Sequence, residues 1–167
     1  MNLVVNDGMA PLETLISKLR ESVKYMKKSP SRMYKFLEIC KSIALEVGEG
    51  LKLDVLTRWS STYRMLSACI AYKDALMCYA DSDANYKWQP SNEEWALYNK
   101  IQLILKALAE VTTAFSGSLY PTANVFYPYI VNVKIALRAA SISTDEHVKR
   151  MGSAMIDKFD KYWAEKK

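Results

Sequence analysis

Apolar residues recur every three or four positions along most of this chain, and that spacing constrains it to fold as helices. The period places apolar side chains on one stripe of a helix, which must then be buried against a neighbouring element. Five segments carry the pattern, at residues 12–26, 33–43, 65–77, 95–115 and 151–163. A further helix is expected over residues 122–140. The sequence therefore predicts an all-α fold, a single bundle of five or six helices over residues 1–167, with at most a short extended segment near residues 51–56.

Polar residues mark where several of these helices begin. Ser31 follows a Ser-Pro pair that interrupts the apolar pattern, and it is the predicted N-cap of the second helix. Thr57 or Ser60 is the predicted N-cap of a long helix that reaches Met77. Each is chosen because a hydroxyl oxygen can accept a hydrogen bond from a free N–H of the first turn.

Two sequence features bear on the later helices. Ser91 is followed three residues on by Glu94, which is the capping-box pattern in which each side chain accepts a hydrogen bond from the other residue's N–H. Pro128 is predicted to kink the helix over residues 122–140 or to lie within its first turns, because proline has no N–H to donate in a helix interior.

Composition places the chain among globular proteins and assigns it no membrane span. Hydrophobic residues make up 50% of it and charged residues 25%, which is usual for a folded domain. No apolar run approaches the roughly 20 residues that a bilayer-spanning helix needs. Cys40, Cys69 and Cys78 lack the Cys-x-x-Cys spacing of a zinc site, so all three are predicted to be buried, reduced thiols. No metal, cofactor or membrane partner is therefore expected.

Positive charge is concentrated in one part of the chain, although the formal net charge is only +5. The basic residues of this run are Lys18, Arg20, Lys24, Lys27, Lys28, Arg32, Lys35 and Lys41, with two acidic residues among them. A basic surface can hold a phosphate backbone, which makes Lys24, Lys27, Lys28 and Arg32 candidate DNA-binding residues. The alternative is an ordinary solvated helix face, and the sequence leaves both open.

Four motifs occur in a fixed order along the chain. Residues 22–32 read S-V-K-Y-M followed by S-P-S-R, and residues 53–63 read L-D-V-L-T-R-W-S-S-T-Y. Residues 115–124 read F-S-G-S-L-Y-P-T-A-N, and residues 158–163 read K-F-D-K-Y-W. Together these motifs resemble hAT-family transposases, most closely the RICESLEEPER-like type of plants that also carries a BED zinc finger. The resemblance covers essentially the whole chain.

The resemblance implies where the family's chemistry would lie. An hAT transposase cuts and joins DNA with a ribonuclease-H-like core, in which two Asp and one Glu bind divalent metal. The two Asp would lie upstream of these motifs, and the Glu far downstream, near a C-terminal dimerisation region. These regions and the BED zinc finger are absent from the 167 residues, so the chain is expected not to be an enzyme. Asp54 is expected to cap a helix or pair with Arg58, and His147 to be exposed and not catalytic.

Arg58 and Trp59 are the pair for which the resemblance implies a function. The family's tryptophan at this position lies near the transposon end, where it can stack on an unpaired base. Such stacking contributes about 1–3 kcal/mol per base, and a neighbouring Arg can hold phosphate. The alternative is that Trp59 anchors the start of its helix in the core. Leu56 replaces the family's Pro and Ser60 its Asn, which favours the structural role.

Tyr120, Tyr127 and Tyr129 cluster around two prolines and are candidate residues of a protein interface. Tyrosine contributes a large contact area and is enriched at interfaces. Half-buried core tyrosines are the alternative reading, and the sequence does not choose between them.

These observations predict a non-catalytic, transposase-derived helical binding module that engages a protein partner, and DNA as well, in the nucleus. Its origin would be a domesticated plant transposable element. The alternative is part of a larger hAT transposase that supports binding to transposon-end DNA. The identity of the partner, assembly as a homo-oligomer and additional residence in the cytoplasm are left open.

Overall fold

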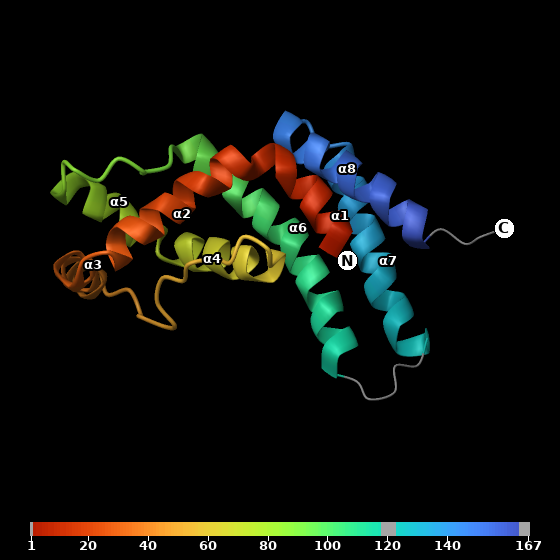
Figure 1. The fold of residues 1–167 in the computed structure, drawn as a ribbon, viewed down its shortest axis with the longest axis horizontal. Helices are drawn as coiled ribbons and strands as arrows, with labels where there is room; N and C mark the ends of the chain where they lie inside the picture. The colour runs from red at the N-terminus through yellow and green to blue at the C-terminus, as the bar shows by residue number, and fades with distance from the viewer. Residues whose placement is uncertain (1, 118–122, 164–167) are drawn as a thin grey trace. The chain divides into compact units, whose positions relative to one another are not determined.

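A computed structural model describes residues 2–117 and 123–163, with side chains described at positions 2–116 and 127–163 (Figure 1). The helices are α1 (Asn2–Met9), η1 (Ala10–Leu12, a 3-10 helix), α2 (Glu13–Lys27), α3 (Pro30–Ser42), α4 (Trp59–Ala71), α5 (Lys73–Ser82), α6 (Asn92–Gly117), α7 (Ala123–Ser141) and α8 (Glu146–Trp163). No strand occurs in these described ranges, so the all-α prediction is confirmed. Residues 51–55 have no regular secondary structure, at the position predicted for the short extended segment.

The helices group into two compact units. Unit 1 comprises Met1–Glu13 and Lys100–Lys167, and unit 2 comprises Thr14–Asn99. Helix α6 contributes residues to both. A single domain over residues 1–167 stays a prediction.

The core of unit 2 is built from the apolar stripes that the sequence predicts. Its buried side chains include Leu19 and Val23 of α2, Phe36 of α3, Leu66 of α4 and Leu76 of α5. Polar contacts join the start of α6 to α2. The Tyr98 hydroxyl donates a hydrogen bond to the carbonyl oxygen of Leu15 at 2.8 Å, and the Lys18 ammonium pairs with Glu94 at 2.6 Å.

The N-cap of helix α3 lies two residues earlier than predicted. Ser29 is the N-cap and Pro30 is the first helical residue, so Ser31 lies inside the helix and the predicted cap is wrong. Proline suits this position because its fixed φ matches the helix and the N–H that it lacks would have no partner there.

The long helix predicted to reach Met77 is two helices. Tyr72 lies between α4 and α5 with φ −98° and ψ 15°, outside the helical conformation. Its side chain is buried, and its ring packs edge-on against the ring of Phe36, with centroids 5.7 Å apart. The apolar spacing runs on through the break, which is why the sequence does not reveal it.

Two predicted helix features are confirmed. At the start of α6, the Ser91 hydroxyl accepts a hydrogen bond from the Glu94 N–H at 3.2 Å, and the Glu94 carboxylate accepts one from the Ser91 N–H at 2.7 Å. Pro128 lies within the first two turns of α7, which begins at Ala123.

The three cysteines are free thiols, but only two are buried as predicted. Cys40 and Cys69 are buried, whereas Cys78 is exposed on α5. Helix α5 buries Ala75, Leu76 and Tyr79, and position 78 lies to the side of that stripe. The prediction is therefore wrong for Cys78.

In unit 1, α8 packs against both α7 and α1 (Figure 1). Helix α8 approaches the end of α7 closely at Gly152. A Cβ atom there would lie 2.4 Å from the backbone nitrogen of Ser141 and 2.6 Å from the carbonyl carbon of Ala140. The two helices can pack this closely only because position 152 has no side chain.

We expect Gly152→Ala to destabilise unit 1 by about 1–3 kcal/mol, because the methyl group would force backbone atoms apart. Without the close contact, alanine would stabilise the helix by about 1 kcal/mol relative to glycine. A loss of stability in Gly152→Ala would therefore report the close packing. Urea unfolding followed by circular dichroism measures it. Gly48→Ala is the control, since nothing lies within 4 Å of a Cβ at that position. A Gly152→Ala variant as stable as the parent would contradict the packing.

Candidate functional site

The motif at residues 53–63 leads from the irregular segment at residues 51–55 into α4. The helix begins at Trp59, and its N-cap is Arg58, which is extended with φ −125° and ψ 94°. Neither Thr57 nor Ser60 occupies the cap, so both predicted caps are wrong.

The hydroxyl of Ser61 holds the turn before α4 together. It accepts a hydrogen bond from the Val55 N–H at 2.7 Å and donates one to the carbonyl oxygen of Arg58 at 2.6 Å. The Arg58 N–H in turn donates to the Val55 carbonyl oxygen at 2.8 Å. The Arg-Trp pair is therefore presented by a turn with its own internal hydrogen bonds.

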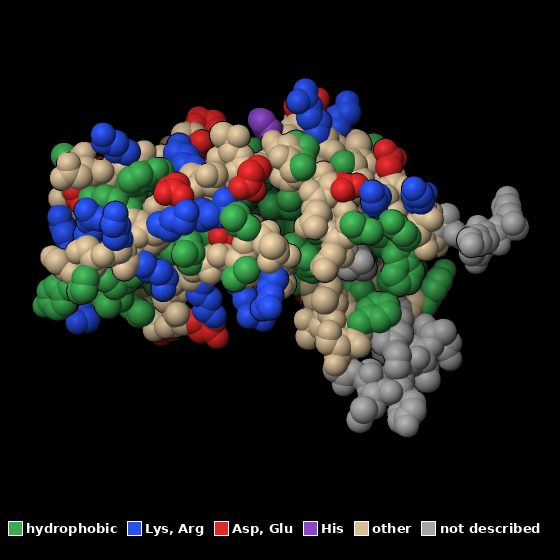
Figure 2. Space-filling model, viewed as in Figure 1, with side chains coloured by type: hydrophobic (Ala, Val, Ile, Leu, Met, Phe, Trp, Pro, Cys, Tyr) green, Lys and Arg blue, Asp and Glu red, His purple; other side chains and the backbone are tan. Residues whose placement is uncertain are grey.

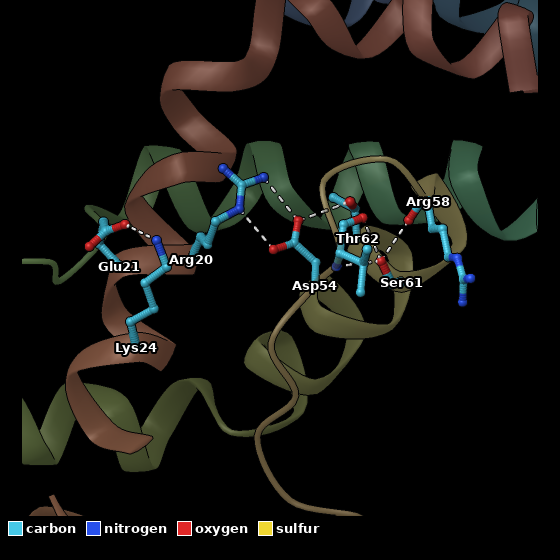
Figure 3. Close-up of polar contacts among 8 residues, drawn as sticks. Arg20, Glu21, Lys24, Asp54, Arg58, Ser61 and Thr62 are labelled. Carbon is cyan, nitrogen blue, oxygen red and sulfur yellow. Dashed lines mark hydrogen bonds and ion pairs between the residues drawn. The ribbon is translucent and has the colours of Figure 1, made fainter. Parts of the chain in front are cut away.

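Asp54 forms a buried ion pair with Arg20 of α2 (Figure 3). Arg20 Nε donates to Asp54 Oδ1 at 2.8 Å, and Arg20 Nη2 donates to Oδ2 at 2.9 Å. The Thr62 hydroxyl, from the first turn of α4, donates to Oδ2 at 3.0 Å. The side chains of Arg20 and Asp54 are 8% and 0% exposed. One carboxylate thus connects α2, the irregular segment at residues 51–55 and α4.

The surroundings of Asp54 lower the pKa of its carboxyl group. Burial alone would raise that pKa, but the hydrogen bonds from Arg20 and Thr62 and the charge of Arg20 together outweigh burial. The carboxylate is therefore ionised at neutral pH, and both of its oxygens accept hydrogen bonds from protein donors.

Arg20 is a site residue that the sequence reasoning misses. The prediction that Asp54 pairs with Arg58 is wrong, because the partner is Arg20, which the sequence suggests only as one member of the basic run. A signal is nevertheless present. Arg20 lies four residues after Ile16 and three before Val23, so it falls on the buried stripe of α2. A charged side chain facing a core needs a buried partner of opposite charge.

Arg58 and Trp59 are adjacent in sequence but differ in exposure. Trp59 is 7% exposed, whereas Arg58 is exposed and its side chain points away from Asp54 (Figure 3). Little of the indole surface is accessible for stacking on a base in this conformation. DNA contact by either residue stays a prediction.

Most of the basic run is engaged within unit 2. Lys24 pairs with a neighbouring glutamate at 2.7 Å. The Arg32 guanidinium lies 3.7 Å from the centre of the Tyr25 ring and donates to the Tyr25 carbonyl oxygen at 3.2 Å. Lys27 and Lys28 are exposed, and no hydrogen bond or ion pair joins the side chain of either to another described residue. Acid or carbonyl partners hold Lys18, Arg20, Lys35 and Lys41.

Figure 2 shows how the charged side chains are distributed on one face of the molecule. Lys and Arg side chains gather over unit 2, and acidic side chains are interspersed among them. Four of the eight basic residues pair with carboxylates, while Arg32 and Lys35 donate to neutral carbonyl oxygens. Among the described residues of this run, Lys27 and Lys28 have neither an ion-pair partner nor a side-chain hydrogen bond.

The candidate interface tyrosines belong to unit 1. Tyr127 and Tyr129 lie on α7 and are 72% and 37% exposed. Tyr120 lies outside the described residues. Two further large apolar side chains of this region are exposed, Ile135 by 61% and Ile142 by 82%.

The described residues form neither a metal-binding cluster nor a membrane-spanning helix. Nowhere in them do three His, Cys, Asp or Glu side chains gather in a way that could hold a metal ion. The described helices also include none with the length and apolarity to cross a bilayer. His147 is exposed at the start of α8, as predicted.

Comparisons with known proteins agree on one family. A family model described as the ZBED1 RNase-like helical domain matches residues 1–104. Zinc finger BED domain-containing protein RICESLEEPER 2 of Oryza sativa subsp. japonica is 34% identical over 163 residues, which is 98% of this chain and 23% of that protein. Putative AC transposase of Zea mays is 33% identical over 165 residues, which is 98% of this chain and 20% of that protein. No solved structure matches.

The chain thus spans about a quarter or less of the length of these relatives. The matched region includes Arg20, Asp54, Arg58 and Trp59, all of which fall within residues 1–104. The chain belongs to the hAT transposase family, in the group that contains the RICESLEEPER BED zinc finger proteins and the AC transposase, and it carries the RNase-like helical domain of that group.

Proposed function

We propose that this chain is a non-catalytic binding module of an hAT-transposase-related protein, and that it engages a protein partner in the nucleus. The observation that carries the proposal is a set of exposed apolar side chains on α7 and directly after its end, namely Tyr127, Ile135 and Ile142. Nuclear residence belongs to the same proposal, because transposition takes place on chromosomal DNA.

Tyr127 and Ile135 lie on α7 eight positions apart, so their side chains fall within roughly a quarter of the helix circumference. Ile142 directly follows Ser141, the last residue of α7. The opposite side of α7 carries Val133 and Leu137, which are buried. Helix α7 therefore has one apolar side packed within unit 1, while Tyr127 and Ile135 are exposed to solvent on its other side, where Arg138 is exposed as well.

Exposed apolar side chains of this kind favour a protein partner. Contiguous exposed apolar surface is uncommon on monomeric proteins and marks interaction sites. Removing such surface from water contributes about 25 cal/mol per Å². Figure 2 shows hydrophobic side chains gathered over the α7 region of unit 1.

The proposal is tested with an Ile135→Ser/Ile142→Ser double variant. Proteins captured from native extract by the parent chain are expected to be lost with this variant, because serine removes the apolar area while leaving the buried side of α7 intact. Leu103→Ser is the control, since Leu103 is 64% exposed on α6 of the same unit. Circular dichroism verifies that both variants are folded. An unchanged set of captured proteins would refute the proposed interface.

DNA contact is a second candidate function, favoured by the exposure of Lys27 and Lys28 without acidic partners. Two lysines would neutralise about two phosphates, and each contributes about 0.9 to the slope of log affinity against log salt on duplex DNA. Binding should therefore be weak, independent of sequence and lost near physiological salt.

We expect a Lys27→Gln/Lys28→Gln double variant to lose most low-salt binding to duplex DNA, measured by fluorescence anisotropy over a salt series. Lys41→Gln is the control, because Lys41 is exposed but paired with Glu38 at 2.9 Å. If the DNA affinity of the double variant still fell steeply with salt concentration, the DNA contacts would lie elsewhere on the chain.

A further inference from the structure

Ser29 and Pro30, at the start of α3, belong to a sequence motif that plays no part in the proposed function. The chain has five prolines, and the residues before them are Ala10, Ser29, Gln89, Tyr120 and Tyr127. Ser29 is therefore the single serine or threonine in the sequence that precedes a proline. Arg32 stands three positions after it. A Ser-Pro pair with a basic residue three positions after the serine is the pattern that proline-directed kinases select.

The local structure makes Ser29 available as a phosphoryl acceptor. Ser29 is the N-cap of α3, with an extended backbone at φ −134° and ψ 123°, and its hydroxyl makes no capping hydrogen bond. It is partly exposed, and the next two residues, Pro30 and Ser31, are exposed. A kinase that binds an extended substrate would therefore need to unwind the first turn of α3 and the last residues of α2, which ends at Lys27.

The same surroundings would hold a phosphate group once it is attached. A phosphoserine carries about −1.5 to −2 charges at neutral pH and offers three strong acceptor oxygens. Lys27 and Lys28 directly precede Ser29 and have no described partner. The N–H groups of Ser31 and Arg32 lie in the first turn of α3, where a helix has no carbonyl acceptors of its own. The positive end of the helix also favours an anion there.

We propose that Ser29 is a phosphorylation site for a proline-directed serine kinase that uses ATP. A bond forms between Ser29 Oγ and the γ-phosphorus of ATP, while the bond from that phosphorus to the β–γ bridging oxygen breaks. The hydroxyl proton passes to a base of the kinase, and ADP leaves. The phosphate then caps α3 and compensates the charges of Lys27 and Lys28.

The first test treats the folded 167-residue chain with a purified proline-directed kinase and magnesium ATP, followed by mass spectrometry of the intact chain and its peptides. The expected result is one phosphate, on Ser29. Ser29→Ala and Pro30→Ala should each abolish it, and Pro30→Ala leaves α3 intact because alanine is a good helix former. Ser31→Ala is the matched control and should be modified like the parent.

The second test measures the second pKa of the attached phosphate by phosphorus NMR. We expect it to lie below the ordinary value of about 6, because nearby cations and the helix end favour the dianion. A Lys27→Gln/Lys28→Gln variant should raise it. Absence of phosphate on Ser29 overturns the site, whether or not a peptide of residues 24–36 is modified. A second pKa unaffected by the lysines overturns the capping role.

Discussion

The Arg20→Ala variant is expected to lose about 3–5 kcal/mol of unfolding free energy, because Asp54 would stay buried without its counter-charge. The Thr62 hydroxyl would remain as a side-chain donor to that carboxylate. Urea unfolding followed by circular dichroism gives the value. Lys24→Ala is the matched control on the same helix, since Lys24 forms an exposed ion pair, and such pairs contribute little.

A double-mutant cycle separates the ion pair from the loss of side-chain volume. Replacing both partners, as Arg20→Met/Asp54→Leu, should cost less than the sum of the two single substitutions, because no unpaired charge stays buried. An Arg20→Ala variant that unfolds like Lys24→Ala would show that the pair is not buried in solution.

The Trp59→Ala variant should be destabilised by a similar amount, about 3–5 kcal/mol, because a large buried ring is removed and a cavity is left. The substitution also tests the structural role of Trp59 against a role in stacking on DNA bases. The melting temperature and the affinity for hairpin or single-stranded DNA are measured on the same protein. Trp163→Ala should cost less, since Trp163 is 43% exposed.

The melting temperature and the DNA affinity of Trp59→Ala distinguish a structural role of Trp59 from a role in DNA binding. A structural Trp59 lowers the melting temperature when it is removed, and any loss of DNA binding follows from unfolding. If Trp59→Ala kept the parent's melting temperature and lost DNA binding, the ring would act on DNA, and the structural role preferred from the sequence would be wrong.

Local sequence information was sufficient for the helices and for some of their ends. The stripe through Leu19 and Val23 and the capping box of Ser91 and Glu94 depend on residues within one or two turns of each other. The break at Tyr72 could not be predicted in this way. It coincides with the burial of the Tyr72 ring against Phe36, which lies on another helix.

The candidate site was predictable only in part, because some of its contacts join residues that are far apart in the sequence. The motif draws attention to Asp54 and Trp59, but the partner of Asp54 lies 34 residues earlier in the chain. A neighbouring Arg58 is the simplest local choice, and it is wrong because that side chain points away from Asp54. Reading Arg20 as a core-facing charge on α2 would have identified the need for a distant carboxylate.

The Arg20–Asp54 pair has a consequence for how the Arg-Trp turn comes to exist. Closing the 34-residue separation between the two side chains carries an entropic cost that rises with the logarithm of loop length. That cost has to be offset by the rest of unit 2 before the pair can form. A short peptide containing residues 51–63 lacks Arg20, so it would not hold Asp54 in this arrangement. The attachment of the turn to α2 is therefore a product of long-range assembly, and a linear motif would keep only the turn's own hydrogen bonds.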